Sequence, residues 1–248
     1  MEFLGVPIER HASIGSTNDE VFRRADEGAR EGLIVVADVQ TAGRGRRGRT
    51  WWDAPGQSLA FSLLLRPTLP LPRCPLLALA MACSVAEGVE LLTGAPAAVK
   101  WPNDVLHQGR KLCGILAESR TGGQAGPVLV IGTGVNVNQS TADFPAEIEA
   151  LATSLRIVAE GKAFDPQEVL RVILARFEPY LALSRDGDGE ALLDRVTSRL
   201  PAVGTAVTVR SAGRIFEGTI QGFTESGALC LLEMGRGEPT VVTVGDLV

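Results

Sequence analysis

The sequence is poor in the residues that build metal centres, disulfides and membrane anchors. Its 248 residues include two histidines and four cysteines, and no two cysteines have C-x-x-C spacing. A zinc site or a thioredoxin-like pair built from a local motif is therefore excluded. The N-terminus has no charged start followed by an apolar stretch and a cleavage site, so we expect a reducing, cytoplasmic environment. The most apolar run, residues 76–86, falls well short of the ~20 residues of a membrane span and predicts a core helix.

Positive charge is concentrated in only one segment and is otherwise scattered. The formal net charge is -5, and the broad basic face of a nucleic-acid-binding protein is missing. Four arginines and three glycines are concentrated in GRGRRGR, residues 43–49, which is followed by Thr50, Trp51 and Trp52. Residues 43–50 are called the arginine loop below.

The apolar pattern predicts an α+β fold with two domains. Residues 16–20 (STNDE) have capping hydroxyls with Glu20 three places after Thr17, which predicts the start of a helix. Further helices are expected at 76–92 and from Asp165 to about Leu200, with a kink or break at Pro179. Strands are expected at 33–39, 58–65, 97–101, 111–118 and 128–138, and shorter ones at 206–209, 214–222, 228–233 and 240–244. We therefore expect a mixed sheet with flanking helices over residues 1–199 and a small β-barrel-like domain over residues 200–248.

The arginine loop has three interpretations. It nearly matches the phosphate loop G-x-x-x-x-G-K-[ST], but such a loop must run into a helix, and here the chain leads through Pro55 and Gly56 to a strand. It is also compatible with a solvated basic loop or a non-specific nucleic-acid contact. As a third interpretation, Gly43, Gly45 and Gly48 permit positive φ, so that the loop is mobile without ligand and orders when an anion pairs with its arginines.

Three more polar clusters lie at the ends of predicted strands. They are KWPND at residues 100–104, Arg110 with Lys111, and GVNVN at residues 134–138. Each alone is typical of an edge strand or a turn. Together with the arginine loop they form a set that can gather polyanions and a divalent cation.

The motifs HASIGSTN, QTAGRGRRGR, KWPNDV, RKLCGILAE and GTGVNVN resemble, in this order and spacing, those of the biotin protein ligases, the biotin–[acetyl-CoA-carboxylase] ligases. The resemblance runs from about Ile8 to Leu155, and the last fifty residues resemble the SH3-like C-terminal domain of that family. It implies a catalytic domain related to class II aminoacyl-tRNA synthetases and lipoate ligases. Because the chain begins almost at the STN motif, we expect the monofunctional type, without the DNA-binding domain of the repressor members.

The resemblance implies that the enzyme makes biotinyl-5'-AMP from biotin and ATP and then transfers biotin to a lysine of a biotin carboxyl carrier protein. It implies Mg²⁺ with ATP, and neither DNA nor a membrane as a partner; a homodimer is left open. Two alternatives stand beside it. One is a lipoate-protein ligase, against which GRGRRG and KWPND argue, and the other is a nucleic-acid-binding regulator that uses the basic loop.

The resemblance also implies roles for single residues. Catalysis is expected from Arg44, Lys111 and Asp104. Biotin is expected to contact Ser16, Thr17, Asn18, Gln40, Arg44, Gly45, Arg46, Lys111 and Gly114. The nucleotide is expected to contact Arg46, Arg47, Arg49, Trp51, Lys100, Asn103, Lys111 and Asn136.

Three further expectations concern Asp104, Cys113 and residues 244–248 of the C-terminal domain. A lysine amine is only about one part in a thousand neutral near pH 7.4, so Asp104 is expected to accept a proton, to orient the amine or to bind Mg²⁺. Cys113 is expected to be a small core residue. Nothing catalytic is expected from residues 244–248, and the C-terminal domain holds either ATP or the carrier protein.

Overall fold

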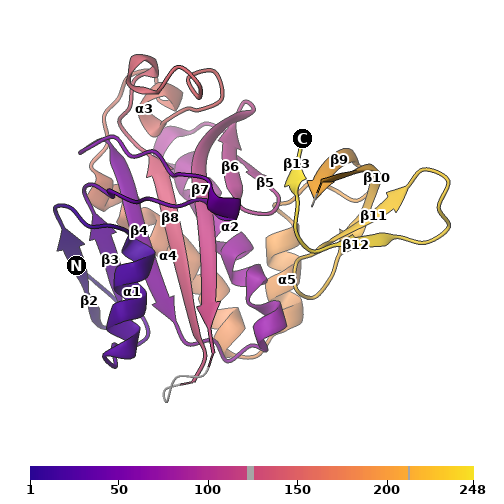
Figure 1. The fold of residues 1–248 in the computed structure, drawn as a ribbon, viewed down its shortest axis with the longest axis horizontal. Coiled ribbons are helices and arrows are strands. Elements are labelled where there is room, and N and C mark those ends of the chain that lie inside the picture. Colours follow the sequence, from indigo (N-terminus) through magenta and orange to yellow (C-terminus); the bar gives the residue numbers. More distant parts are fainter. Residues whose placement is uncertain (122–125, 212) are drawn as a thin grey trace.

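The computed structural model describes residues 1–121, 126–211 and 213–248. The described chain forms a mixed sheet in the order β1-β2-β3-β4-β8-β7-β6-β5 and an antiparallel sheet in the order β12-β11-β10-β9-β13 (Figure 1). The first sheet consists of β1 (Glu2–Phe3), β2 (Val6–His11), β3 (Ile34–Ala37), β4 (Ser58–Leu65), β5 (Ala98–Lys100), β6 (Asp104–His107), β7 (Arg110–Arg120) and β8 (Val128–Asn136). The second consists of β9 (Ala206–Ser211), β10 (Arg214–Phe223), β11 (Leu229–Glu233), β12 (Thr240–Val242) and β13 (Asp246–Leu247). The helices are α1 (Thr17–Asp26), α2 (Pro75–Thr93), α3 (Leu155–Val158), α4 (Pro166–Arg185) and α5 (Gly189–Thr197).

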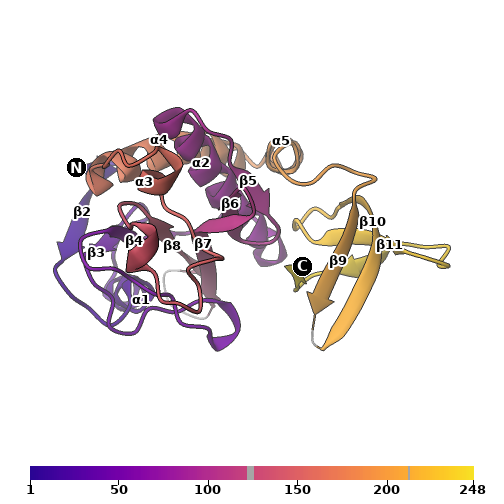
Figure 2. The ribbon, with the colours of Figure 1, turned by 90° about the horizontal axis from the view of Figure 1, so that it is seen from above.

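Helices cover both faces of the large sheet. Helix α1 packs on β3, β4 and β8 from one side, while α2 and α4 lie on the other side (Figure 2). Strand β4 in the middle is consequently buried along its whole length. A continuous apolar run is the expected pattern for such a strand, and the predicted bounds of 58–65 are confirmed.

The core helix predicted at 76–92 is confirmed as α2. It begins with Pro75 at its first position and ends at Gly94, whose φ of 72° is the left-handed geometry that glycine adopts at a helix end. The segment Leu71–Thr93 is long and apolar enough to cross a membrane by length and composition, but 72% of its most apolar window is buried inside the protein. Its apolar surface is therefore used in the core.

Helix α4 begins as predicted, with the Asp165 side chain accepting a hydrogen bond from the backbone N–H of Gln167. The predicted break at Pro179 is wrong, because the helix continues to Arg185. Phe177 and Tyr180 on either side of the proline are buried in the core, and this packing outweighs the lost backbone hydrogen bond. The helical segment instead breaks at residues 186–188, where Gly187 has a φ of 75°.

Four strands were not predicted from the sequence. Strands β1 and β13 have two residues each, and β6 has four. Strand β2 carries Pro7 and the charged residues Glu9 and Arg10, which weaken its apolar pattern. These strands form because neighbouring strands offer hydrogen-bond partners, such as the parallel pairing of β2 with β3.

The second sheet stands beside the β5 and β6 end of the first (Figure 2). The indole N–H of Trp101 donates to the backbone oxygen of Gly227 across the junction, at 2.9 Å. Gly245, directly before β13, approaches the Trp101 ring so closely that a Cβ there would lie 3.4 Å from it. The chain crosses between the sheets after α5 ends at Thr197 and before β9 begins at Ala206; the domain boundary at 199–200 stays a prediction.

Candidate functional site

Three glycines form a flat floor on the face of the sheet that carries α1. Gly114 of β7 pairs with Gly134 of β8, and Gly132 lies two residues before Gly134. A Cβ on Gly134 would lie 2.3 Å from the Trp51 ring, and one on Gly132 would lie 2.3 Å from Oδ1 of Asn18. The absence of side chains on the floor therefore lets Trp51 and Asn18 rest directly on the backbone.

The N-terminus of α1 forms a neutral, hydrogen-bonded end of the site, called the head end below. Oε1 of Gln40 accepts from the backbone N–H and the hydroxyl of Thr17, at 3.0 and 3.1 Å. The Ser62 hydroxyl is hydrogen-bonded to Thr17 Oγ1 at 2.7 Å. Asn18 donates to Glu118 at 2.6 Å. Thr17, Asn18 and Ser62 are buried, so this end presents a fixed set of polar atoms that suits a small neutral head group.

The arginine loop is a short hairpin. Arg44 pairs with Thr50 in an antiparallel bridge, and the backbone N–H of Trp51 donates to the oxygen of Gly43. Of the three loop glycines, which all permit positive φ, only Gly48 adopts it, at 74°. Gly43 is required for another reason, because a Cβ there would lie 2.9 Å from the backbone oxygen of Trp51. Mobility of the loop stays a prediction.

Two cations of the site are paired with carboxylates of the large sheet and α1. Arg44 forms two hydrogen bonds to Asp19, at 2.6 and 2.7 Å. These bonds hold the pKa of the Asp19 carboxyl below its usual range. Nζ of Lys111 lies 2.8 Å from Oδ1 of Asp104. An anionic ligand would therefore compete with protein carboxylates for these two groups.

The other three arginines of the loop converge on Asp246 of the second sheet. Arg46 and Arg47 lie 3.3 and 3.2 Å from its carboxylate oxygens, and Arg49 also contacts it. Arg46 additionally donates to Oδ1 of Asn103 at 2.7 Å, and burial lowers its pKa. The sequence indicated nothing catalytic at residues 244–248, yet Asp246 lies in the wall of the site.

The structure brings most of the predicted site residues into one pocket. All nine predicted biotin residues line it, as do Asp104 and the predicted nucleotide residues Arg46, Arg49, Trp51, Asn103 and Lys111. Arg47, Lys100 and Asn136 do not line it. Asn136 is buried and donates to the backbone oxygen of Thr153 at 2.9 Å, which positions a neighbouring loop. The roles of all these residues stay predictions.

Sequence reasoning missed several residues that line the same pocket. They are Thr50, Ile115, Leu116, Gly132, Thr133, Gly134 and Asp246. Alternating glycines within the apolar strand 128–136 were a signal for the floor, because glycine in a strand often marks a close approach of other groups. Cys113 is fully buried, as predicted, and burial raises the pKa of its thiol.

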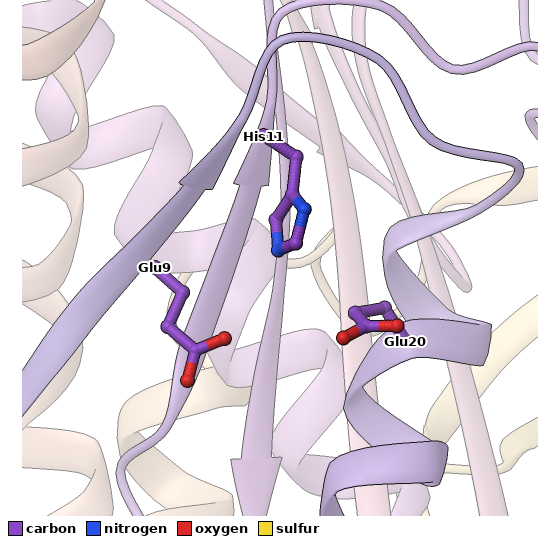
Figure 3. Close-up of side chains that lie close together, drawn as sticks. All are labelled: Glu9, His11 and Glu20. Atoms are coloured by element: carbon purple, nitrogen blue, oxygen red, sulfur yellow. The ribbon is translucent and has the colours of Figure 1, made fainter.

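Glu9, His11 and Glu20 form a separate cluster between β2 and α1 (Figure 3). One potential ligand atom from each lies within 4.8 Å of the others. Arg24, however, contacts Glu9 at 2.6 Å and Glu20 at 3.2 Å, and Arg23 contacts Glu20 at 2.6 Å. Because guanidinium groups already neutralise both carboxylates, we assign no metal site here.

Comparison with known proteins agrees with this arrangement. Residues 12–136 match the model of the Biotin/lipoate A/B protein ligase family. The chain belongs to this family. It is 38% identical to the bifunctional ligase/repressor BirA of Bacillus subtilis over 95% of this chain and 72% of the relative. It is 35% identical to the biotin–[acetyl-CoA-carboxylase] ligase of Mycobacterium tuberculosis, over 96% of this chain and 86% of the relative.

Among solved structures, the biotin protein ligase of Aquifex aeolicus in complex with biotin and ATP superposes with a TM-score of 0.79. The two chains are 30% identical, and the match covers 97% of each. The similarity therefore includes both sheets of this family member. It confirms the expected α+β architecture with a mixed catalytic sheet and a small C-terminal β domain.

Proposed function

We propose that this protein is an ATP-dependent biotin ligase that forms biotinyl-5'-AMP and transfers biotin to a lysine of a biotin carboxyl carrier protein. The observation that carries the proposal is the division of a single pocket into a neutral head end and a cationic end. Thr17, Asn18 and Gln40 offer hydrogen-bonding atoms for the ureido head group. Arg44, Lys111 and the other loop arginines that line the pocket form the cationic end and offer positive charge for a carboxylate and a phosphate. Relatives named as biotin ligases and a solved relative with biotin and ATP bound support it.

In the first step, a carboxylate oxygen of biotin attacks the α-phosphorus of ATP. A carboxyl–phosphate bond forms, and the bond from the α-phosphorus to the oxygen of pyrophosphate breaks, releasing pyrophosphate. The reactants repel each other, so the site must neutralise charge that builds on the phosphate oxygens. Arginine suits this task because its planar fork binds two oxygens, whereas Lys111 supplies a compact charge. One such donor contributes on the order of 3 kcal/mol to the transition state.

In the second step, a neutral lysine amine of the carrier attacks the acyl carbon, and AMP leaves. Asp104 lines the pocket beside Lys111 and can accept the amine proton once Lys111 pairs with the adenylate. Trp51 lies on the glycine floor and limits the access of water, which would hydrolyse the mixed anhydride.

Mg²⁺ fits this site as an ion held chiefly by the phosphates of ATP. Asp104 and Asp246 are the carboxylates that line the pocket in the described part of the chain, and Mg²⁺ commonly uses one or two carboxylates with substrate phosphates. It would supply further charge neutralisation. The same proposal includes a cytoplasmic location and no DNA partner. It leaves the choice between monomer and homodimer open.

The decisive experiment incubates the protein with Mg-ATP and either biotin or lipoate. We expect pyrophosphate and an acyl adenylate with biotin, detected by mass spectrometry, and biotinylation of an added carrier domain. Adenylate formation with lipoate alone would replace the proposal by the lipoate ligase alternative. A salt-sensitive affinity for duplex DNA, unchanged by biotin and without adenylate formation, would favour the regulator.

A further inference from the structure

Asp53 lies behind the pocket, on the segment that joins the arginine loop to β4. Its Oδ2 accepts a hydrogen bond from Nε2 of Gln40 and its Oδ1 accepts one from the indole N–H of Trp51, each at 3.2 Å. The carboxylate does not line the pocket, whereas Gln40 and Trp51 both do. From outside the pocket, Asp53 therefore contacts Gln40 of the head end and Trp51, which is called the aromatic wall below.

Toward the head end, Asp53 determines the orientation of the Gln40 amide. The Nε2 group of Gln40 donates to the carboxylate, so that Oε1 faces the two donors of Thr17. A reversed amide would place Nε2 against these N–H and O–H groups and Oε1 against a carboxylate. The hydrogen bonds then continue from Thr17 to Ser62.

Toward the other side, Asp53 interacts with the Ser58 side chain at the start of β4. The Ser58 hydroxyl accepts from the backbone N–H of Ala54 at 3.1 Å and from Gln139 at 2.8 Å. Gln139 also reaches Oδ1 of Asn136 at 3.4 Å. Asp53 thus lies between the hydrogen bonds of the head end and those around Ser58. Burial raises the pKa of its carboxyl, although each of these contacts opposes that shift.

We propose that Asp53 is a positioning residue that holds Gln40 and Trp51 in one arrangement, and so links recognition of the biotin head group to the aromatic wall of the pocket. The link to biotin rests on the proposed ligase function. The link between the side chains does not, because the contacts exist in the protein without ligand. A hydrogen bond to a charged group contributes about a tenfold change in affinity, so loss of Asp53 is expected to weaken biotin binding about tenfold.

The test compares Asp53→Ala, Asp53→Asn and the control Asp38→Asn in the full chain. Asp38 lies two residues before Gln40, but its side chain pairs with Arg10. For Asp53→Ala we expect the KM for biotin to rise about tenfold, with kcat at saturating biotin within about threefold. Asp53→Asn keeps one acceptor and should recover part of the loss, and Asp38→Asn should match the wild type. In a Gln40→Ala background, Asp53→Ala should have a smaller effect than in the wild type, because the contact with Gln40 is already lost and only the contact with Trp51 remains to be broken.

A second measurement is independent of activity. In ¹⁵N spectra of the ligand-free protein, the indole N–H resonance of Trp51 should shift in Asp53→Ala and stay in place in Asp38→Asn. An unchanged resonance, or a kcat loss without a KM change, would overturn the positioning role. If the wild type forms no biotinyl adenylate while the resonance still shifts, the ligase function is refuted and the link between Asp53 and Trp51 stands.

Discussion

The two ends of the pocket differ in how their polar groups are paired. At the head end, buried neutral groups satisfy one another: Gln40 with Thr17, and Thr17 with Ser62. At the cationic end, half-exposed arginines are paired with carboxylates, such as Arg44 with Asp19. A neutral ligand group can add to the first arrangement without breaking it. An anion at the second competes with the carboxylates already there, so the head end is preorganised and we expect the cationic end to exchange contacts.

The ion pairs of the cationic end also connect the two sheets. Asp246 holds three arginines of the loop while lying in β13, and Trp101 and Gly227 keep the sheets together nearby. A phosphate that bound these arginines would compete with a carboxylate of the second sheet. In this arrangement the C-terminal sheet contributes directly to the cationic end.

Replacing Lys111 by alanine should have the largest effect, because it removes a compact charge from the cationic end and leaves Asp104 without its partner. We expect the rate of adenylate formation to fall about a hundredfold or more. Pre-steady-state release of pyrophosphate measures this rate. Lys111→Arg keeps the charge and should retain part of the rate. A loss confined to the KM for biotin would place Lys111 in simple binding instead.

A methyl group on Gly134 should disturb the floor shared by both ends. Its Cβ would lie 2.3 Å from the Trp51 ring, so the indole must move. Overpacking of this kind typically costs 1–3 kcal/mol, and we expect biotin binding by Gly134→Ala to weaken about tenfold in calorimetry. Gly237→Ala is the matched control, because nothing lies within 4 Å of the added atom there. Normal affinity in Gly134→Ala would mean that Trp51 leaves the floor when ligand binds.

Removing the Asp246 carboxylate tests the exchange of partners. If Asp246 competes with phosphates for Arg46, Arg47 and Arg49, Asp246→Ala should lower the KM for ATP about threefold and leave the KM for biotin unchanged, as expected for partly exposed ion pairs. Steady-state kinetics measures both constants. Glu225→Ala serves as the control, because it breaks another contact between the sheets, with Arg73. A higher KM for ATP would show that Asp246 orders the loop rather than competing with the nucleotide.

The sequence predicted the two ends of the pocket unequally well. Local patterns sufficed for the STN helix start, β4 and the arginine loop, because capping, apolar runs and charge clusters are properties of neighbouring residues. Asp246 was missed because its partners are 197 to 200 residues away in the chain. Asp53 precedes Ala-Pro-Gly and has the sequence context of a turn residue. Its role depends on the fold, which brings Gln40 and Ser58 to it.

The smallest expected effect is a difference in pH dependence between the two ends. Arg44 lowers the pKa of Asp19 in the folded protein below the value of 3.8 of an ordinary aspartate. The pair therefore stabilises the fold above that value, and the contribution is lost as the pH falls through the lower, folded pKa. Asp19 is more than half exposed, so the contribution is about 0.5 kcal/mol. Asp53 has the opposite shift, because burial disfavours its charge, and its contribution declines as the pH rises. Urea unfolding of the wild type and of Asp19→Asn should thus differ near pH 7 and converge only as the pH falls below 3.8. A difference that grows at low pH would mean that Asp19 is stabilised by burial rather than by Arg44.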